Sequence, residues 1–134
     1  DDSGSSDTNS LFNGTTRNGK GAADTLNDGK TYRAFGAGHS LLMKLPGYKG
    51  AKIGEIQTFA GHGDGRASQA YSVWIAKADA PGFFIKVADA KVDSTGGSSR
   101  LRVPLDAKNV AAVRLDFADG PAGVNVYREI VIVR

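Results

Sequence analysis

The chain has 134 residues, a length that fits one domain built around one hydrophobic core. It contains no cysteine, which excludes disulfides, thiolate metal sites and a thiol nucleophile. The 17 Lys and Arg residues outnumber the 14 Asp and Glu residues and give a net charge of +3. The basic residues are spread along the chain, without the concentrated basic stripe that is typical of nucleic-acid binding. We therefore expect no nucleic-acid partner. The mild positive charge leaves open a preference for an acidic glycan.

The N-terminal part of the chain has the composition of a linker. Residues 1–10, DDSGSSDTNS, contain only Asp, Ser, Gly, Thr and Asn, so we expect a disordered tail there. Residues 11–134 are then a single module. Within it, residues 11–40 are rich in Gly and Asn and predict a long loop region with one short strand.

The rest of the chain reads as short β-strands. Apolar residues alternate with polar ones in seven runs, which are separated by Gly, Pro and Asp turns: 40–46, 51–60, 70–77, 83–88, 99–105, 109–118 and 125–134. In the run 109–118, for example, Val113, Leu115 and Phe117 share one face of the predicted strand. Pro104 predicts an edge strand or a bulge. The pattern indicates an all-β fold, an antiparallel β-sandwich or a barrel.

One turn carries more polar side chains than a connection needs. The stretch FAGHGDGRASQAYSVWI places His62, Asp64, Arg66 and Gln69 around three glycines, just before a strand. An imidazole and a guanidinium donate to hydroxyl groups, whereas a carboxylate and an amide oxygen accept from them. This set suits sugar recognition. Alternatively, Arg66 pairs with Asp64, and Gln69 ties the turn to the backbone.

Sugar recognition also needs an aromatic ring for the apolar face of the sugar. Tyr71, Trp74 and Tyr127 are the candidates for that ring, although Trp74 lies inside a predicted strand and is expected in the core. Catalysis has less support. The chain has two histidines and no GxSxG, HExxH or phosphate-binding loop, and nothing singles out a pair of carboxylates. We expect a non-catalytic protein.

Glu129 stands among apolar residues in the last run, VYREIVIVR, where Tyr127, Val131 and Val133 would share its face. It either faces solvent at an edge, paired with a basic residue, or ligates a cation. Calcium takes hard oxygen ligands, which the stretch DTLNDGKT at residues 24–31 could supply.

Several motifs occur in an order that resembles a known family. A DG loop, the IGEIQTF strand, GHGDGRASQAYSVWI, AVRLDF and a terminal VYREIVI follow one another across residues 22–133. This order is similar to that of discoidin-like (factor V/VIII C-type) galactose-binding-like domains, which include the family 32 carbohydrate-binding modules. The resemblance implies an eight-stranded jelly-roll sandwich that binds ligands through loops at one end.

The resemblance also implies a set of site residues. Many members hold a structural calcium between an early DG loop and a glutamate of the last strand, which here correspond to Asp28, Thr31 and Glu129. In sugar-binding members a His, an Arg, an Asn and an aromatic residue contact the ligand. His62 and Arg66 match the first two roles, and Asn125 and Tyr127 the last two.

Together these observations predict a carbohydrate-binding module of a larger secreted or cell-surface protein. We expect it to be a monomer that attaches a catalytic domain to a polysaccharide or oligosaccharide through a shallow loop site. The alternative is an architectural or protein-interaction sandwich without a sugar site. Attachment to membranes is disfavoured because the loop GHGDGRAS has no large apolar side chain to insert.

Overall fold

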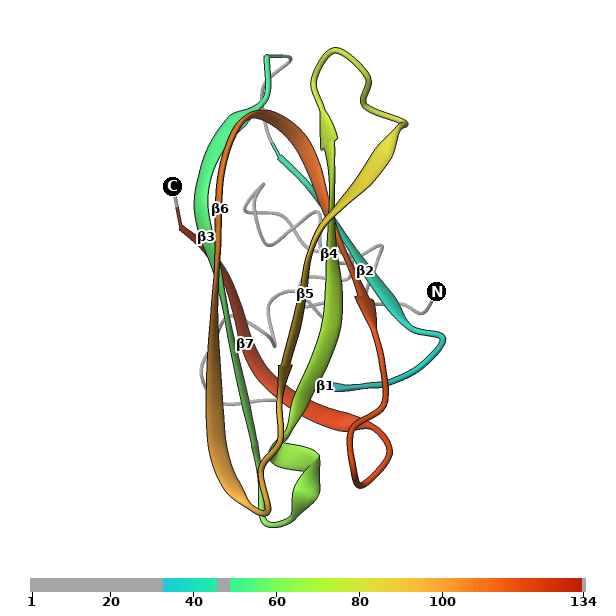
Figure 1. The fold of residues 1–134 in the computed structure, drawn as a ribbon, viewed down its shortest axis with the longest axis vertical. Helices are drawn as coiled ribbons and strands as arrows, with labels where there is room; N and C mark the ends of the chain where they lie inside the picture. Colours follow the sequence, from blue (N-terminus) through green and yellow to red (C-terminus); the bar gives the residue numbers. More distant parts are fainter. Residues whose placement is uncertain (1–32, 46–48, 134) are drawn as a thin grey trace, which may run out of the picture.

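The computed structural model describes residues 33–45 and 49–133, so the expectations for the tail and for most of the early loop lie outside the described residues. The described chain is almost entirely β-structure, as predicted (Figure 1). Its elements are β1 (Arg33–Phe35), β2 (Ser40–Lys44), β3 (Ala51–His62), the 3-10 turn η2 (Gly65–Ala67), β4 (Gln69–Lys77), β5 (Phe84–Val92), β6 (Gly97–Phe117) and β7 (Asn125–Val133).

One long strand builds both layers of the sandwich. The predicted runs 99–105 and 109–118 form the single 21-residue strand β6, which pairs with β3 over its first part and with β4 and β2 over its second. Asp106 and Asn109 adopt positive φ angles of 47° and 57° at the change of partner. These residue types tolerate the left-handed region better than most, so the strand bends there instead of ending. All neighbouring strands are antiparallel, in the order β1-β7-β3-β6-β4-β5 with β2 beside β6.

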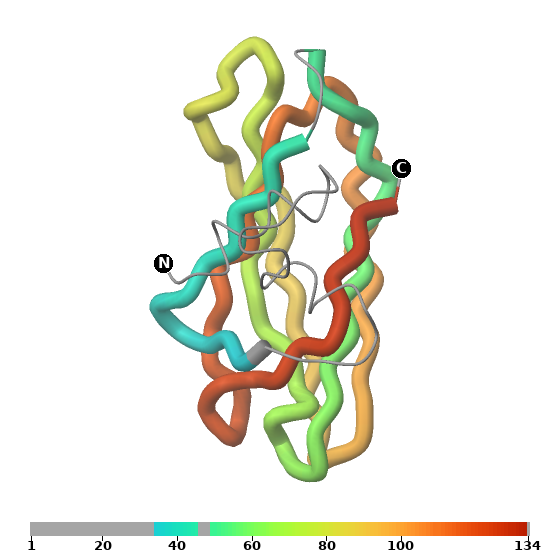
Figure 2. The backbone as a smooth tube through the Cα atoms, turned by 180° about the vertical axis from the view of Figure 1, so that it is seen from behind, coloured from blue at the N-terminus to red at the C-terminus, as the bar shows by residue number. Residues whose placement is uncertain are grey.

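The core lies between the two layers, one containing β1, β7, β3 and the first part of β6, the other β2, the second part of β6, β4 and β5 (Figure 2). Val113, Leu115 and Phe117 are buried as predicted, and on the opposite face Arg114 donates to Asp116 at 2.9 Å. Phe35 stacks on Phe117 with ring centroids 4.5 Å apart. Pro104 lies where β6 pairs only with β3 among the described strands, next to a register shift, which confirms the predicted edge and bulge.

The structure corrects two expectations about faces. A bulge in the β3–β7 pairing between Phe59 and Ala60 interrupts the alternation of β7, so Tyr127 is buried whereas Glu129 is partly exposed, and the two do not share a face. Trp74 is not in the core: it is half-buried on the outer face of β4, where the Arg114 guanidinium lies 4.9 Å from its ring centroid.

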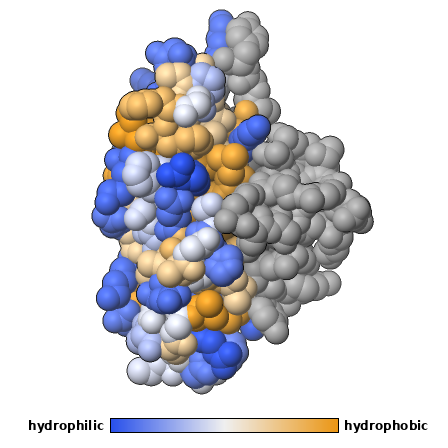
Figure 3. Space-filling view, turned by 90° about the vertical axis from the view of Figure 1, so that its right-hand side faces the viewer, coloured by the Kyte–Doolittle hydropathy of each residue, from blue (hydrophilic) through white to orange (hydrophobic). Residues whose placement is uncertain are grey.

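The strand β5 lies at the edge of the sheet and pairs only with β4 among the described strands. Its apolar run remains exposed, with Phe83 at 66%, Ile85 at 51% and Val87 at 43%. Alternation identifies residues that share a face of a strand, but that face is buried only where another element packs against it. Figure 3 shows apolar surface gathered in its upper part, at the end of the molecule where Figure 1 places the β4–β5 turn.

Three connections meet at the opposite end. The β3–β4 loop with η2, the β5–β6 turn and the β6–β7 loop all lie at the lower end of the sandwich in Figure 1. The predicted polar turn with His62, Asp64 and Arg66, called the corner below, therefore lies in a loop at one end of the sandwich. No helix among the described residues is long and apolar enough to cross a membrane.

Candidate functional site

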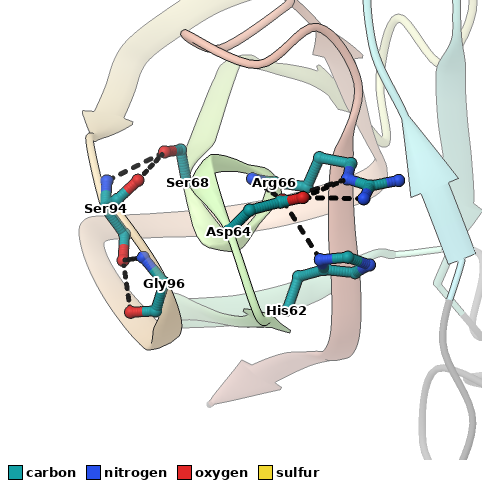
Figure 4. Close-up of polar contacts among 6 residues, drawn as sticks. All are labelled: His62, Asp64, Arg66, Ser68, Ser94 and Gly96. Atoms are coloured by element: carbon teal, nitrogen blue, oxygen red, sulfur yellow. Dashed lines mark hydrogen bonds and ion pairs between the residues drawn. The ribbon is translucent and has the colours of Figure 1, made fainter.

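The polar corner folds around Asp64. This residue caps η2, and its carboxylate accepts a hydrogen bond from the Arg66 backbone N–H at 2.9 Å. The Arg66 side chain holds both carboxylate oxygens, with Nε 3.0 Å from Oδ1 and Nη2 2.7 Å from Oδ2. His62 Nδ1 lies 3.1 Å from Asp64 Oδ1 on the other side (Figure 4). The carboxylate thus orients a ring and a guanidinium from one short loop.

The pairing with Arg66 sets the charge of the corner. The guanidinium is the main cause, and the Arg66 backbone N–H the second, of a pKa of Asp64 far below its usual range. Asp64 is therefore an anion throughout the physiological pH range, so it accepts hydrogen bonds and donates none.

These three side chains keep contact with solvent while they contact one another. Side-chain exposure is 32% for His62, 50% for Asp64 and 42% for Arg66. The sequence left two alternatives, an outward-facing set and an internally paired one. For His62, Asp64 and Arg66 both alternatives hold: the Arg66–Asp64 ion pair forms at the surface, and all three side chains stay partly exposed to solvent.

A second set of hydrogen bonds fixes the loop to its neighbour. Ser68 Oγ donates to the Ser94 carbonyl oxygen at 3.1 Å and accepts from the Ser94 N–H at 2.8 Å, and Ser94 Oγ in turn bonds to the backbone of Gly96 (Figure 4). The β3–β4 loop and the β5–β6 turn are thereby tied together. A polar group held in this way loses less conformational freedom on binding a ligand.

Gln69 does not belong to this surface. It is fully buried, and its amide nitrogen lies 3.1 Å from the carbonyl oxygens of Thr58 and Ser99 and from Ser99 Oγ. Its oxygen accepts from Thr58 Oγ1 at 2.5 Å. The expectation that Gln69 contacts a ligand is corrected, because the first residue of β4 points into the core and its hydrogen-bonding capacity is used there.

Asn125 and Tyr127 are also internal. Both are fully buried. The Tyr127 hydroxyl accepts a hydrogen bond from the Ala70 N–H at 3.1 Å. The ring centroids of Tyr127 and Phe117 lie 5.0 Å apart. Burial raises the pKa of Tyr127 well above its ordinary value, and that of Tyr71 to about 12. Asn125 packs so closely on Gly120 that a Cβ on the glycine would lie 2.4 Å from the Asn125 Oδ1 atom. The proposed amide and ring for the sugar are therefore structural residues.

The predicted calcium site falls mostly outside the described residues. Asp28 and Thr31 are both outside, and only Glu129 is placed, on β7 opposite Phe59. Within residues 33–45 and 49–133 no group of three or more His, Asp or Glu side chains could hold a metal ion. Calcium requires six or more oxygen ligands, so one carboxylate does not test the site, and calcium stays a prediction.

Sequence reasoning missed a depression beside the corner. It has a volume of about 730 Å³ and is open to solvent on the outer face of β3, β6 and β7. Its lining residues come from the ends of these strands: Phe59, Ala60, Gly61, His62, Gly63, Gly97, Ser98, Ser99, Arg100 and Arg128. No local pattern in the sequence indicated that Arg100 and Arg128 line the same hollow.

Two layers joined by one bent strand, with polar loops gathered at one end, form an antiparallel β-sandwich. Comparison with solved structures confirms the resemblance seen in the sequence at the level of the fold. No family model matches the sequence, and a comparison with curated proteins finds no match either.

Solved structures give the comparison. The Clostridium perfringens module CpGH89CBM32-5, in complex with GalNAc-β-1,3-galactose, matches with a TM-score of 0.62 and 18% identity over 86% of this chain and 85% of that one. CBM32-1 from a family 31 glycoside hydrolase of the same organism matches with a TM-score of 0.60 and 9% identity, covering 82% of each chain. Both are family 32 carbohydrate-binding modules, and at these identities the likeness shows the fold.

Proposed function

We propose that this chain is a non-catalytic carbohydrate-binding module. It attaches a larger secreted or cell-surface protein, and the catalytic domain of that protein, to a polysaccharide. The observation that carries the proposal is the His62–Asp64–Arg66 group, three half-exposed polar side chains held in one geometry at the loop end of a fold shared with sugar-binding modules.

The chemistry of the corner suits a sugar. The Nε2 atom of His62 and the acceptor oxygens of Asp64 match the mixed donor and acceptor character of sugar hydroxyls. Each hydrogen bond to a hydroxyl replaces one to water and nets only about 0.5–1.5 kcal/mol. We therefore expect weak binding per site, increased by multivalent attachment to a polymer.

A ring for the sugar is available near the corner, although it is none of the three predicted. Phe59 is half-buried on the outer face of β3 and lines the depression that His62 also lines. The apolar face of a sugar placed there would cover the Phe59 ring while its hydroxyls reach the corner. This placement replaces the roles first given to Asn125 and Tyr127.

Binding to oligosaccharides that contain galactose or N-acetylgalactosamine tests the proposal. We expect retention of the protein on a glycan array and a loss of retention in His62→Ala and Phe59→Ala. Lys77→Ala is the matched control, because Lys77 lies at the other end of β4 and donates only to the Lys108 carbonyl among the described residues. Binding to no glycan of a broad panel would reject the proposal.

A protein-interaction domain is the second candidate, favoured by the exposed apolar residues of β5. Phe83, Ile85 and Val87 form an uncovered edge that a sugar-binding role does not use. Concentration-dependent self-association, measured by analytical ultracentrifugation and abolished by Ile85→Lys, would support this candidate. A monomer at all concentrations would leave carbohydrate binding ahead, in agreement with the expected monomeric state.

A further inference from the structure

The depression on the outer face of β3, β6 and β7 has a charge that a neutral sugar does not require. Two guanidinium groups line it, Arg100 from β6 and Arg128 from β7. Arg100 is exposed, and its guanidinium carbon lies 6.0 Å from the Phe59 ring centroid. Both arginines therefore border the surface on which a sugar ring would lie.

The neighbouring Arg66 and Arg102 form close ion pairs, whereas Arg100 forms none among the described residues. Arg102 forms a two-point ion pair with Glu55, at 3.0 and 3.1 Å, and Arg66 forms one with Asp64. No carboxylate of the described residues lies within 4 Å of the Arg100 side chain. Glu129 lies opposite Phe59 on β7, and Arg100 interacts with the Glu55 carboxylate only over a longer range, so Arg100 lines the hollow without a close ion pair.

Glycines open this surface to an incoming group. A Cβ on Gly61 would lie 3.3 Å from Arg128 Nε, so the missing side chain leaves room for Arg128 to lie over β3. Gly97 has a φ of +90°, and a Cβ there would meet nothing within 4 Å, which leaves the β6 side of the rim open. Ser98, exposed on the same strand, adds a hydroxyl donor.

We propose that this depression is a subsite for an anionic substituent, a sulfate ester or a uronate carboxylate, on the glycan bound at the adjacent corner. The inference rests on the proposed function and narrows its ligand class. Guanidinium groups bind carboxylates and sulfates through paired, charge-assisted hydrogen bonds, and these are stronger than hydrogen bonds to neutral hydroxyls. His62 lines the hollow and contacts Asp64, so one sugar chain can reach both.

The experiment compares matched polymers and matched charge changes. Isothermal titration measures binding to a sulfated galactan, to the same galactan after desulfation, to polygalacturonic acid and to its methyl ester. The variants are Arg100→Gln and, as a control, Lys108→Gln, which removes one positive charge from the bend of β6 at the opposite end. Melting temperatures verify that both variants are folded.

We expect Arg100→Gln to lower the affinity for one anionic polymer by about tenfold and to leave its neutral counterpart unchanged. The polymer that is affected identifies sulfate or carboxylate as the ligand group. Gly61→Ala, which crowds Arg128, should weaken the same interaction. Lys108→Gln should have no effect.

Three outcomes would overturn the inference. Equal losses in Arg100→Gln and Lys108→Gln would indicate a non-specific effect of net charge. Equal affinity of the wild type for charged and neutral polymers would remove the subsite but leave the proposed function intact. Binding to none of the four polymers, together with an empty glycan array, would reject the proposed function and the subsite with it.

Discussion

The buried amide of Gln69 gives the sharpest test of which polar residues are structural. Methionine has a similar volume and no hydrogen-bonding amide, so Gln69→Met removes the polar contacts and leaves the packing nearly unchanged. The amide nitrogen has three acceptors at 3.1 Å but only two hydrogens, and the oxygen accepts once, so three hydrogen bonds are lost.

The magnitude follows from that count. At about 1 kcal/mol for each buried hydrogen bond, the free energy of unfolding should fall by about 3 kcal/mol. For a domain of this size that corresponds to a fall of roughly 10 °C in melting temperature. Differential scanning calorimetry measures this change directly.

The control makes the same substitution on the outer face of β3. Gln57 is half-buried, and its amide donates to Glu55 at 2.6 Å, so Gln57→Met should cost less than about 1 kcal/mol. Folded Gln69→Met should also bind glycan as well as the wild type does. A stability loss no larger than that of Gln57→Met, or a loss of glycan affinity equal to that of His62→Ala, would refute the reasoning.

Three further predictions concern the corner, the core and the metal. The depressed pKa of Asp64 means that its pairing stabilises the fold above the unfolded-state pKa of about 4 and is lost as pH falls further, so the difference in melting temperature between wild type and Asp64→Asn should shrink in acid. Tyr127→Phe leaves the Ala70 N–H without its hydroxyl partner and should lower stability by about 1–2 kcal/mol in urea unfolding, with glycan affinity unchanged. Calcium should raise the melting temperature and chelator should reverse this; an equal response in Glu129→Gln would remove Glu129 from the metal site.

The charge distribution near the corner provides a further test of the proposed anionic subsite. Arg66–Asp64 and Arg102–Glu55 are surface ion pairs near the corner, whereas Arg100, which lines the hollow, has no carboxylate of the described residues within 4 Å. Binding to an anionic polymer should therefore weaken as salt increases, whereas binding to its neutral counterpart should not.

Much of the fold could be predicted from the sequence because the alternation of apolar residues is a local property. Period-2 runs such as AYSVWIAK and NVAAVRLDF identify strands and the faces that carry Val73 or Leu115 without knowledge of their partners. The turn residues between the runs, and the cluster His62, Asp64 and Arg66, could be recognised in the same way. The Arg66–Asp64 pair was anticipated as an alternative because the two residues are only two positions apart.

Tertiary structure decided what depends on pairing between distant strands. The bulge opposite Phe59 separates Tyr127 from Glu129, and the bend at Asp106 and Asn109 joins two predicted strands into one. A one-residue shift in register reverses every side chain beyond it, and nothing in a single strand records where its neighbour will impose that shift. For the same reason, only the assembled sheet brings Arg100 and Arg128, 28 positions apart in the chain, to one hollow beside the corner.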